Sequence, residues 1–328
     1  MLEIGKNIIN NKEIKHSLIT LFLRGIGVLT LFGFTIFFNR NFNSSVVGDY
    51  EFTRMFLLVS GSICLLGSDI SILYFSGKLK SEDRFYELKN LYYKISLLCF
   101  IFCIAVGFIF FVFFDIKFIN SFFGSNNSYT IISTCILFLF FNVWTLFNTE
   151  VLRALIKIFC SNFFKNTLKF FLFFFGAFIL FQSGNEENII FYYIFGFVIL
   201  SLITTTFVMI LLNKIPKSNN FHTPISYREI IDYSLPMGIS SFVVYLFSTI
   251  DIIILRNYYS SSDVALYALG IKIMAILGMI ILSINVNLSS QIAELYLKKE
   301  FDQLKQILTR SGRLIFITSL IIGLSIIM

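Results

Sequence analysis

Long apolar runs constrain the fold of this chain more than any other feature of its sequence. Two of them, residues 233–255 and 264–292, are separated by a short polar turn, and a charged segment at 294–305 follows. A helix crosses a bilayer core of ~30 Å with ~20 apolar residues. The stretch therefore predicts a helical hairpin that spans a membrane, followed by an amphipathic helix on the membrane surface.

Runs of this kind recur along the whole chain. Hydrophobic residues make up 57% of the sequence and charged residues only 14%, whereas soluble domains average roughly 45–50% and 25%. We therefore expect an all-α polytopic membrane protein with about nine transmembrane helices. The expected spans are residues 17–38, 52–76, 95–114, 129–148, 168–182, 189–212, 233–255, 264–292 and 314–328.

The hairpin repeats a plan that appears earlier in the chain. At an offset of 216 positions, IFFNRNFNSS at 36–45 aligns with IIILRNYYSS at 252–261, and FYELKNLYYK at 85–94 aligns with FDQLKQILTR at 301–310. Repeats of this length are typical of transporters built from two halves. Chance similarity between two hydrophobic hairpins with charged ends is the alternative.

The repeat predicts two domains. Residues 1–216 would form an N-terminal six-helix transmembrane bundle, and residues 217–328 an incomplete second bundle with only the first three helices of a pseudo-symmetric partner. We therefore expect a C-terminal truncation, with about 100 further residues in the intact protein. A broken pseudo-symmetry is the alternative.

Lysine and arginine side chains fall mainly on one side of the predicted membrane. If the N-terminus is cytoplasmic, most of the 26 Lys and Arg residues lie in inner segments, among them Lys165 just before the fifth span and Lys169 at its inner end. This distribution agrees with the positive-inside rule, so a cytoplasmic N-terminus is predicted. Membrane topology thereby explains the net charge of +7, and nucleic acid is not an expected partner.

The sequence offers little for catalysis or metal binding. Its two histidines, His16 and His222, lie outside the predicted spans, and its five cysteines show no metal-ligand spacing. The cysteines are interpreted as small apolar packing residues. The outer loops are too short for an external catalytic domain. We therefore expect no enzyme, no catalytic residue, no metal and no cofactor.

Four charged residues of the predicted spans stand out as candidates, because charges within spans are costly and normally face a cavity or a partner. Arg24 and Lys272 are the two cations. Facing one cavity, they would attract an anionic headgroup and donate to its phosphate oxygens. Snorkelling of either side chain to the membrane surface is the alternative.

Asp69 is either an interfacial helix end or a cavity residue. Asp251 is predicted to meet a cation on another helix, as a structural pair or as a gate.

Other charged residues lie near the ends of predicted spans. Arg40, Arg54 and Arg256 are predicted to ring the outer mouth and are candidates for substrate binding. The alternative is that they only anchor helix ends. Glu150 and Arg153, at the inner end of the fourth span, are interpreted as a solvated helix end.

Several motifs are similar in order and spacing to those of one exporter superfamily. The C-terminal half contains Leu235-Pro236, DIIILR at 251–256, ALY at 265–267, AELY at 293–296 and FDQLK at 301–305. The N-terminal half contains Arg40, GDY at 48–50 and GSD at 67–69. On these motifs the chain resembles the multidrug/oligosaccharidyl-lipid/polysaccharide exporter superfamily, and within it the Wzx-type O-antigen or capsule-repeat flippases.

This resemblance implies two six-helix bundles around a central cavity, faced by a basic residue of the first helix, here Arg24. It implies a flippase of the bacterial inner membrane. Such a flippase moves undecaprenyl-pyrophosphate-linked oligosaccharide units to the outer leaflet for surface polysaccharide biosynthesis. The implied partners are this lipid-linked oligosaccharide, membrane lipids and, as coupling ion, H⁺ or Na⁺. A MATE-like cation-coupled multidrug antiporter and an inactive truncated remnant are the alternatives.

Overall fold

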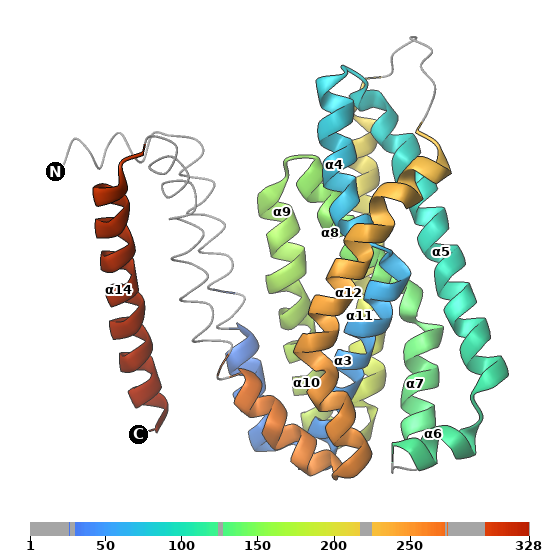
Figure 1. Cartoon of the computed structure of the whole chain (residues 1–328). Coiled ribbons are helices and arrows are strands. Elements are labelled where there is room, and N and C mark those ends of the chain that lie inside the picture. Colours follow the sequence, from blue (N-terminus) through green and yellow to red (C-terminus); the bar gives the residue numbers. More distant parts are fainter. Residues whose placement is uncertain are drawn as a thin grey trace. The chain divides into compact units, whose positions relative to one another are not determined.

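All regular structure in the described part of the chain is helical (Figure 1). The computed structural model describes residues 26, 30–123, 127–216, 225–272, 274 and 299–327. The chain divides into two compact units, Met1–Leu266 and Tyr267–Met328. The expected class, an all-α polytopic membrane protein, is confirmed. The expected division of the chain at residue 216 stays a prediction. It was based on a sequence repeat, whereas the two units are defined by how compactly their residues pack.

Most of the described helices belong to the first unit. They are α3 (Ser44–Leu65), α4 (Ser68–Ser81), η1 (Phe85–Glu87), α5 (Leu88–Phe113), α6 (Ile116–Phe122), α7 (Ser128–Leu137), α8 (Leu139–Ala154), α9 (Ile158–Asn162), the π-helix η2 (Phe163–Leu168), α10 (Lys169–Ser183), η3 (Glu186–Asn188), α11 (Ile189–Asn213) and α12 (Tyr227–Tyr258). The second unit contains α14 (Phe301–Ile327). Residues 30–41 and 261–272 are also helical.

Four helical segments in the described residues are long and apolar enough to cross a membrane. They are Phe85–Phe113, Ile158–Ser183, Glu186–Asn213 and Tyr227–Tyr258. Two bent pairs, α3 with α4 and α7 with α8, bring the number to six if each pair is one span. These six segments match the expected second to seventh spans. The first and eighth expected spans lie largely outside the described residues and the ninth lies within α14, so a total of nine stays a prediction.

Three segments differ from expectation. The fifth span begins at Ile158 rather than at residue 168, because α9, η2 and α10 form one segment. Lys165 therefore lies within a span and not in an inner loop, and Lys169 lies in the middle of the span rather than at its inner end. The outer loop at 115–128 contains α6, which Asp115 caps by accepting a hydrogen bond from the Phe118 amide. From Phe301 on, the expected surface helix and the ninth span belong to one continuous helix, α14.

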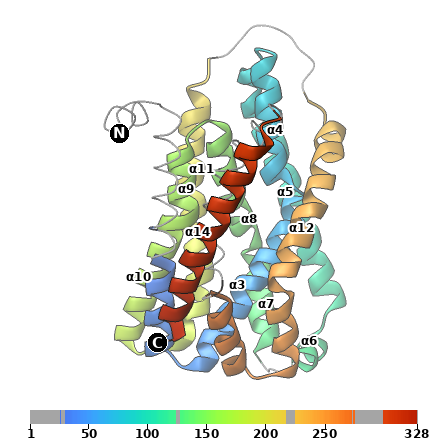
Figure 2. The same ribbon diagram turned by 60° about the vertical axis from the view of Figure 1, so that its left-hand side comes forward.

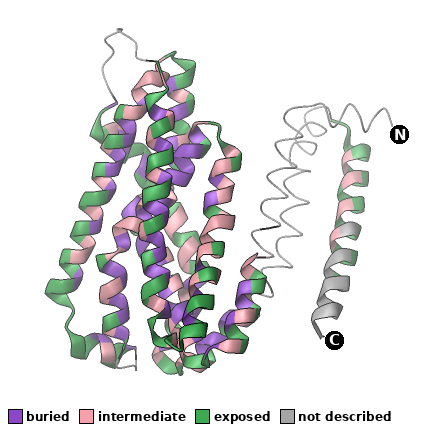
Figure 3. Cartoon of the chain, turned by 180° about the vertical axis from the view of Figure 1, so that it is seen from behind, coloured by how far each residue is buried: buried purple, intermediate pink, exposed green. Residues whose placement is uncertain are grey.

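Aromatic side chains fill much of the space between the helices of the first unit. Tyr50 of α3 is 1% exposed and meets the ring of Tyr193 of α11 edge-on, 4.9 Å between centroids. At Gly196 a Cβ atom would lie 2.7 Å from the ring of Phe173, so glycine allows α10 and α11 to approach closely. Helices associate in lipid through such close packing, because lipid tails are as apolar as the side chains they replace. Figure 3 shows that these helices also carry many exposed residues. A large number of them are apolar.

The longest described helix, α12, packs along the bent pair α3 and α4 (Figures 1 and 2). The pair is bent by 41° because Leu66 and Gly67 adopt the left-handed conformation, with φ of 48° and 74°. Gly67 tolerates this conformation since it has no Cβ atom. Discontinuous helices of this kind often mark the substrate path in transporters. The bend therefore places Asp69, in the first turn of α4, at a break in a candidate span.

Candidate functional site

A role in substrate binding stays a prediction for all seven residues that were expected to bind substrate. Arg24 lies outside the described residues, and the half-buried Lys272 belongs to the second unit. Their expected meeting at one headgroup therefore stays a prediction. Arg40 is exposed at the end of the helix at 30–41, and Asp251 is exposed on α12. Their roles at the outer mouth and as a gate also stay predictions.

We expected Arg54 at the outer mouth, but it lies inside the first unit. It is about 15 Å along the axis of α3 from Ser44, at 1.5 Å per residue. Its Nε donates to Glu51 Oε2 at 3.0 Å, and the Glu51 side chain is 1% exposed. The i, i+3 spacing places both side chains on one face of the helix. Arg54 is thus one partner of an ion pair within α3.

Lys169 is a cation in the middle of a candidate span. It lies within the continuous helical segment Ile158–Ser183. Its Nζ is 5.1 Å from the ring centre of Phe197 and 5.7 Å from that of Phe170. No carboxylate among the described residues lies within ion-pair distance of it. Aromatic faces attract a cation, but they leave its N–H groups available to an anionic ligand.

Glu150 connects the end of α8 to the π-helix η2. Its Oε1 accepts from Lys165 Nζ at 2.7 Å, and its Oε2 accepts from Arg153 Nη1 at 3.5 Å. Glu150 is 7% exposed, so the interpretation of this residue as a solvated helix end is wrong. Lys165 is more open, with 42% of its side chain exposed. Single π-helical turns occur often at functional sites, and this one presents Lys165.

Arg54, Lys165 and Lys169 form what we call the cationic row. Lys169 lies within electrostatic range of both other residues. Arg54 belongs to α3 and the two lysines to the segment Ile158–Ser183, so two separate helical segments supply the row. Two of its members already have a carboxylate partner, whereas Lys169 has none among the described residues. Three cations at span depth favour binding of an anion.

Asp69 is an acidic candidate on which the charge of one member of this row, Lys165, acts. It lies in the first turn of α4, where the helix dipole stabilises a carboxylate. Its Oδ1 is buried and has no hydrogen-bond partner among the described residues. It also lies within electrostatic range of Glu150 and Lys165. The structure therefore places Asp69 at a helix break beside the cationic row.

Arg256 joins the two repeats at one end of α12. Its Nη2 lies 2.6 Å from Asp49 Oδ1 at the start of α3. The Ser261 hydroxyl donates to the same Asp49 oxygen at 2.9 Å and accepts from Arg256 Nη1. The Arg256 side chain is 1% exposed and covers the ring of Phe52 at 5.5 Å. Arg256 is therefore buried in an ion pair, and its expected contact with substrate stays a prediction.

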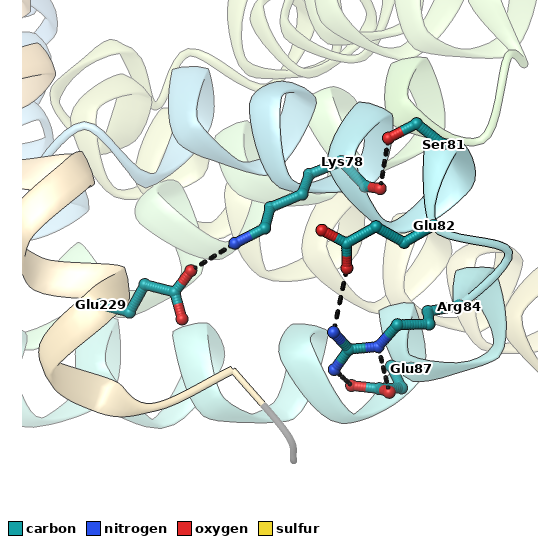
Figure 4. A network of polar contacts seen from close by, with 6 residues as sticks. All are labelled: Lys78, Ser81, Glu82, Arg84, Glu87 and Glu229. Carbon is teal, nitrogen blue, oxygen red and sulfur yellow. Dashed lines mark hydrogen bonds and ion pairs between the residues drawn. The ribbon is translucent and has the colours of Figure 1, made fainter. Parts of the chain in front are cut away.

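A second polar cluster lies at the other end of α12 (Figure 4). Lys78 of α4 donates to Glu229 of α12 at 2.7 Å. Arg84 binds Glu82 and, through two nitrogens, Glu87. Hydrogen bonding to Glu87 raises the pKa of Arg84, so its guanidinium stays charged. Only the Lys78–Glu229 pair of Figure 4 connects α4 to α12, because the Arg84 contacts stay within residues 82–87.

Sequence reasoning missed Asp49, Glu51, Lys165 and Lys169 as members of these clusters. The two lysines were overlooked because the fifth span was taken to begin at residue 168, which placed both of them at its inner end. A lower hydropathy was the available signal, since Ile158–Ser183 averages 1.5 where the other three candidate segments average 2.0 to 3.0. Polar groups within an apolar helix lower its mean hydropathy while they face a cavity or a partner.

Comparison with known families gives one match. Residues 236–328 match the family model MatE, a segment that begins inside α12 and includes α14. MatE belongs to the exporter superfamily that the sequence motifs resemble, and its members are transporters and not enzymes. No curated protein and no solved structure matches the chain.

Proposed function

We propose that this protein is a membrane flippase for undecaprenyl-pyrophosphate-linked oligosaccharide units in surface polysaccharide biosynthesis. The match to MatE supports a transporter, and the cationic row supports an anionic substrate. The single observation that carries the choice of substrate is Lys169, a cation in mid-span with no carboxylate partner among the described residues. A membrane protein keeps such a costly group when it serves a substrate.

In this proposal the cationic row holds the pyrophosphate. Ammonium and guanidinium groups form short, charge-assisted hydrogen bonds with phosphate oxygens. Lys169 would donate first because the other two cations are occupied by Glu51 and Glu150. Lys165, with 42% of its side chain exposed, would donate next by exchanging Glu150 for phosphate. The oligosaccharide would follow the headgroup, and the prenyl tail would stay in lipid.

A cation-coupled antiporter is the second candidate, and a different observation favours it. Asp69 Oδ1 is buried without a hydrogen-bond partner among the described residues. Glu150 is within its electrostatic range. Two carboxylates near one another favour a proton or a metal cation. The MatE match is equally consistent with this candidate.

Complementation separates the two candidates. The chain, expressed in a flippase-deficient strain, should restore surface polysaccharide. Lys169→Ala should abolish the effect, and Lys169→Arg should retain part of it because it keeps the charge. Lys117→Ala is the matched control, since Lys117 lies exposed on α6 outside the cationic row. Efflux of cationic dyes that depends on Asp69, together with no restored polysaccharide, would favour the antiporter.

A further inference from the structure

The contact between α12 and the bent pair α3 and α4 has three levels, and we call it the seam. At one end, Asp49 meets Arg256, and the hydroxyls of Ser44 and Ser262 lie 2.8 Å apart. At the middle, the backbones of Gly67 and Gly238 approach each other. At the other end, Lys78 meets Glu229. The helices of the seam therefore run antiparallel over the full length of α12.

The middle level is built from backbone. A Cβ atom at Gly238 would lie 2.5 Å from the Leu66 carbonyl carbon and 2.7 Å from the Gly67 nitrogen. Both sides of the contact have a local irregularity, because α3 and α4 bend here and Pro236 lies within the continuous helix α12. Proline removes one helical hydrogen bond and weakens the helix locally. This level therefore combines close contact with local freedom to bend.

The Asp49 end of the seam is tightly closed. Arg256 is 1% exposed there, and the Ser261 hydroxyl contacts both members of the pair. A Cβ atom at Gly48 would overlap the Ser261 carbonyl. Separating a buried ion pair leaves an uncompensated charge in a poorly solvated place. Opening this end is therefore unfavourable unless another group replaces the lost partner.

The Lys78 end is held more loosely. The side chains of Lys78 and Glu229 are 33% and 31% exposed, so water solvates both when they part. Exposed ion pairs contribute little to stability. The rings of Tyr74 and Tyr233 stack nearby, with centroids 4.9 Å apart. Lys94 also donates to the Ile225 carbonyl at 2.6 Å, a neutral acceptor that water can replace.

We propose that the seam is a pivot with two unequal latches. The Gly67–Gly238 contact is the pivot, Asp49–Arg256 the strong latch, and Lys78–Glu229 the weak one. The resting protein therefore opens at the Lys78 end, which the lysine and arginine distribution predicts to be cytoplasmic. This inference rests on the proposed transport function, because only a transporter needs the seam to part. Loss of the strong latch reverses which end opens.

Thiol labelling tests the proposal on the full chain in detergent, where the reagent reaches both ends. Thr249→Cys reports the Asp49 side of the pivot and Ser234→Cys the Lys78 side, and both native residues are 2% exposed. Cys160→Ser serves as background, because the other four cysteines are buried. With both latches intact, we expect Ser234→Cys to react with a maleimide faster than Thr249→Cys.

Asp49→Asn is then expected to raise the Thr249→Cys labelling rate on the order of tenfold, because the two-state equilibrium shifts when a buried pair is broken. Glu229→Gln should leave that rate unchanged. Glu87→Gln is the matched control, since it breaks the neighbouring Arg84–Glu87 pair without touching α12. Arg256→Lys provides a second variant, which keeps the charge, in case Asp49→Asn does not fold.

Equal labelling of the two probes with both latches intact would overturn the proposal. The proposal would also be overturned if Asp49→Asn and Arg256→Lys both fold and both leave the labelling rate of Thr249→Cys unchanged. A third contrary result is that either variant raises the labelling rates of the two probes equally. The readout uses no substrate. If complementation fails but the labelling pattern is as expected, only the proposed function is rejected. If complementation succeeds but the labelling pattern is not as expected, only the latches are rejected.

Discussion

Arg256 Nη2 lies 2.6 Å from Asp49 Oδ1, and the Arg256 side chain is 1% exposed. The pair connects the end of α12 to the start of α3, which belong to different sequence repeats. The repeat equivalent of Arg256 is Arg40, which is exposed. The two repeats are thus similar in sequence here but different in their contacts. A buried charge of this kind depends on its partner much more than an exposed one does.

Asp49→Ala should lower the stability of the protein markedly. The change leaves the Arg256 guanidinium buried without its carboxylate, a loss of about 3–5 kcal/mol in comparable cases. Thermal unfolding in detergent measures the effect. Asp232→Ala is the control, because the Arg228–Asp232 pair is exposed and 3.8 Å long and should contribute little. Similar melting temperatures for the two variants would contradict the structural role of Asp49.

Gly238→Ala should separate α12 from the bend between α3 and α4. The added methyl group would lie 2.5 Å from the Leu66 carbonyl carbon, which cannot move without the backbone. We expect a lower melting temperature and faster thiol labelling on both sides of the pivot. Gly176→Ala is the matched control, because no heavy atom lies within 4 Å of its added Cβ. That variant should be as stable as the parent or slightly more stable, since alanine favours a helix.

Asn148→Leu should destabilise the packing of α5, α8 and α11. The Asn148 amide contacts the Tyr92 hydroxyl at 3.0 Å and the Thr205 hydroxyl at 2.9 Å, and Asn148 is fully buried. Leucine leaves these hydroxyls without partners, which costs about 1–3 kcal/mol for a buried group. Adding Tyr92→Phe should recover part of the loss, because it removes one stranded hydroxyl. A double-mutant cycle on unfolding free energies measures this coupling, and strict additivity would contradict it.

Lys169→Met should abolish transport while leaving stability unchanged or higher. Methionine has a similar length, and Lys169 has no carboxylate partner among the described residues to lose. Lys165→Met is the contrasting variant. It strands the buried Glu150, since the remaining Arg153 contact is longer at 3.5 Å, and it should lower the melting temperature. Paired transport and unfolding measurements test this. A large loss of stability in Lys169→Met would show that Lys169 serves the fold.

The candidate site was predictable only in part. The expectation of charged residues at span depth led to Asp69, and the structure places it at a helix break. Lys165 and Lys169 were counted with an inner segment, because a boundary judged by hydropathy moves when charged residues lie within the helix. Glu150 was interpreted as solvated, because its burial depends on η2, which precedes α10 in the same segment. Helix composition carries no information about which neighbour covers a side chain.

The sequence by itself determined that this protein lies in a membrane and that its secondary structure is helical. Apolar runs of membrane-spanning length identify helices because every backbone group in lipid must be paired within its own segment. The apolar run at 233–255 located α12, and the short turn at 257–263 located its end. The helix begins earlier than expected, at Tyr227, and Pro236 lies in its interior. Tertiary structure alone decided that Asp49 pairs with Arg256, and that Gly67 meets Gly238. These contacts depend on how distant helices pack, and many packings satisfy the same hydropathy pattern.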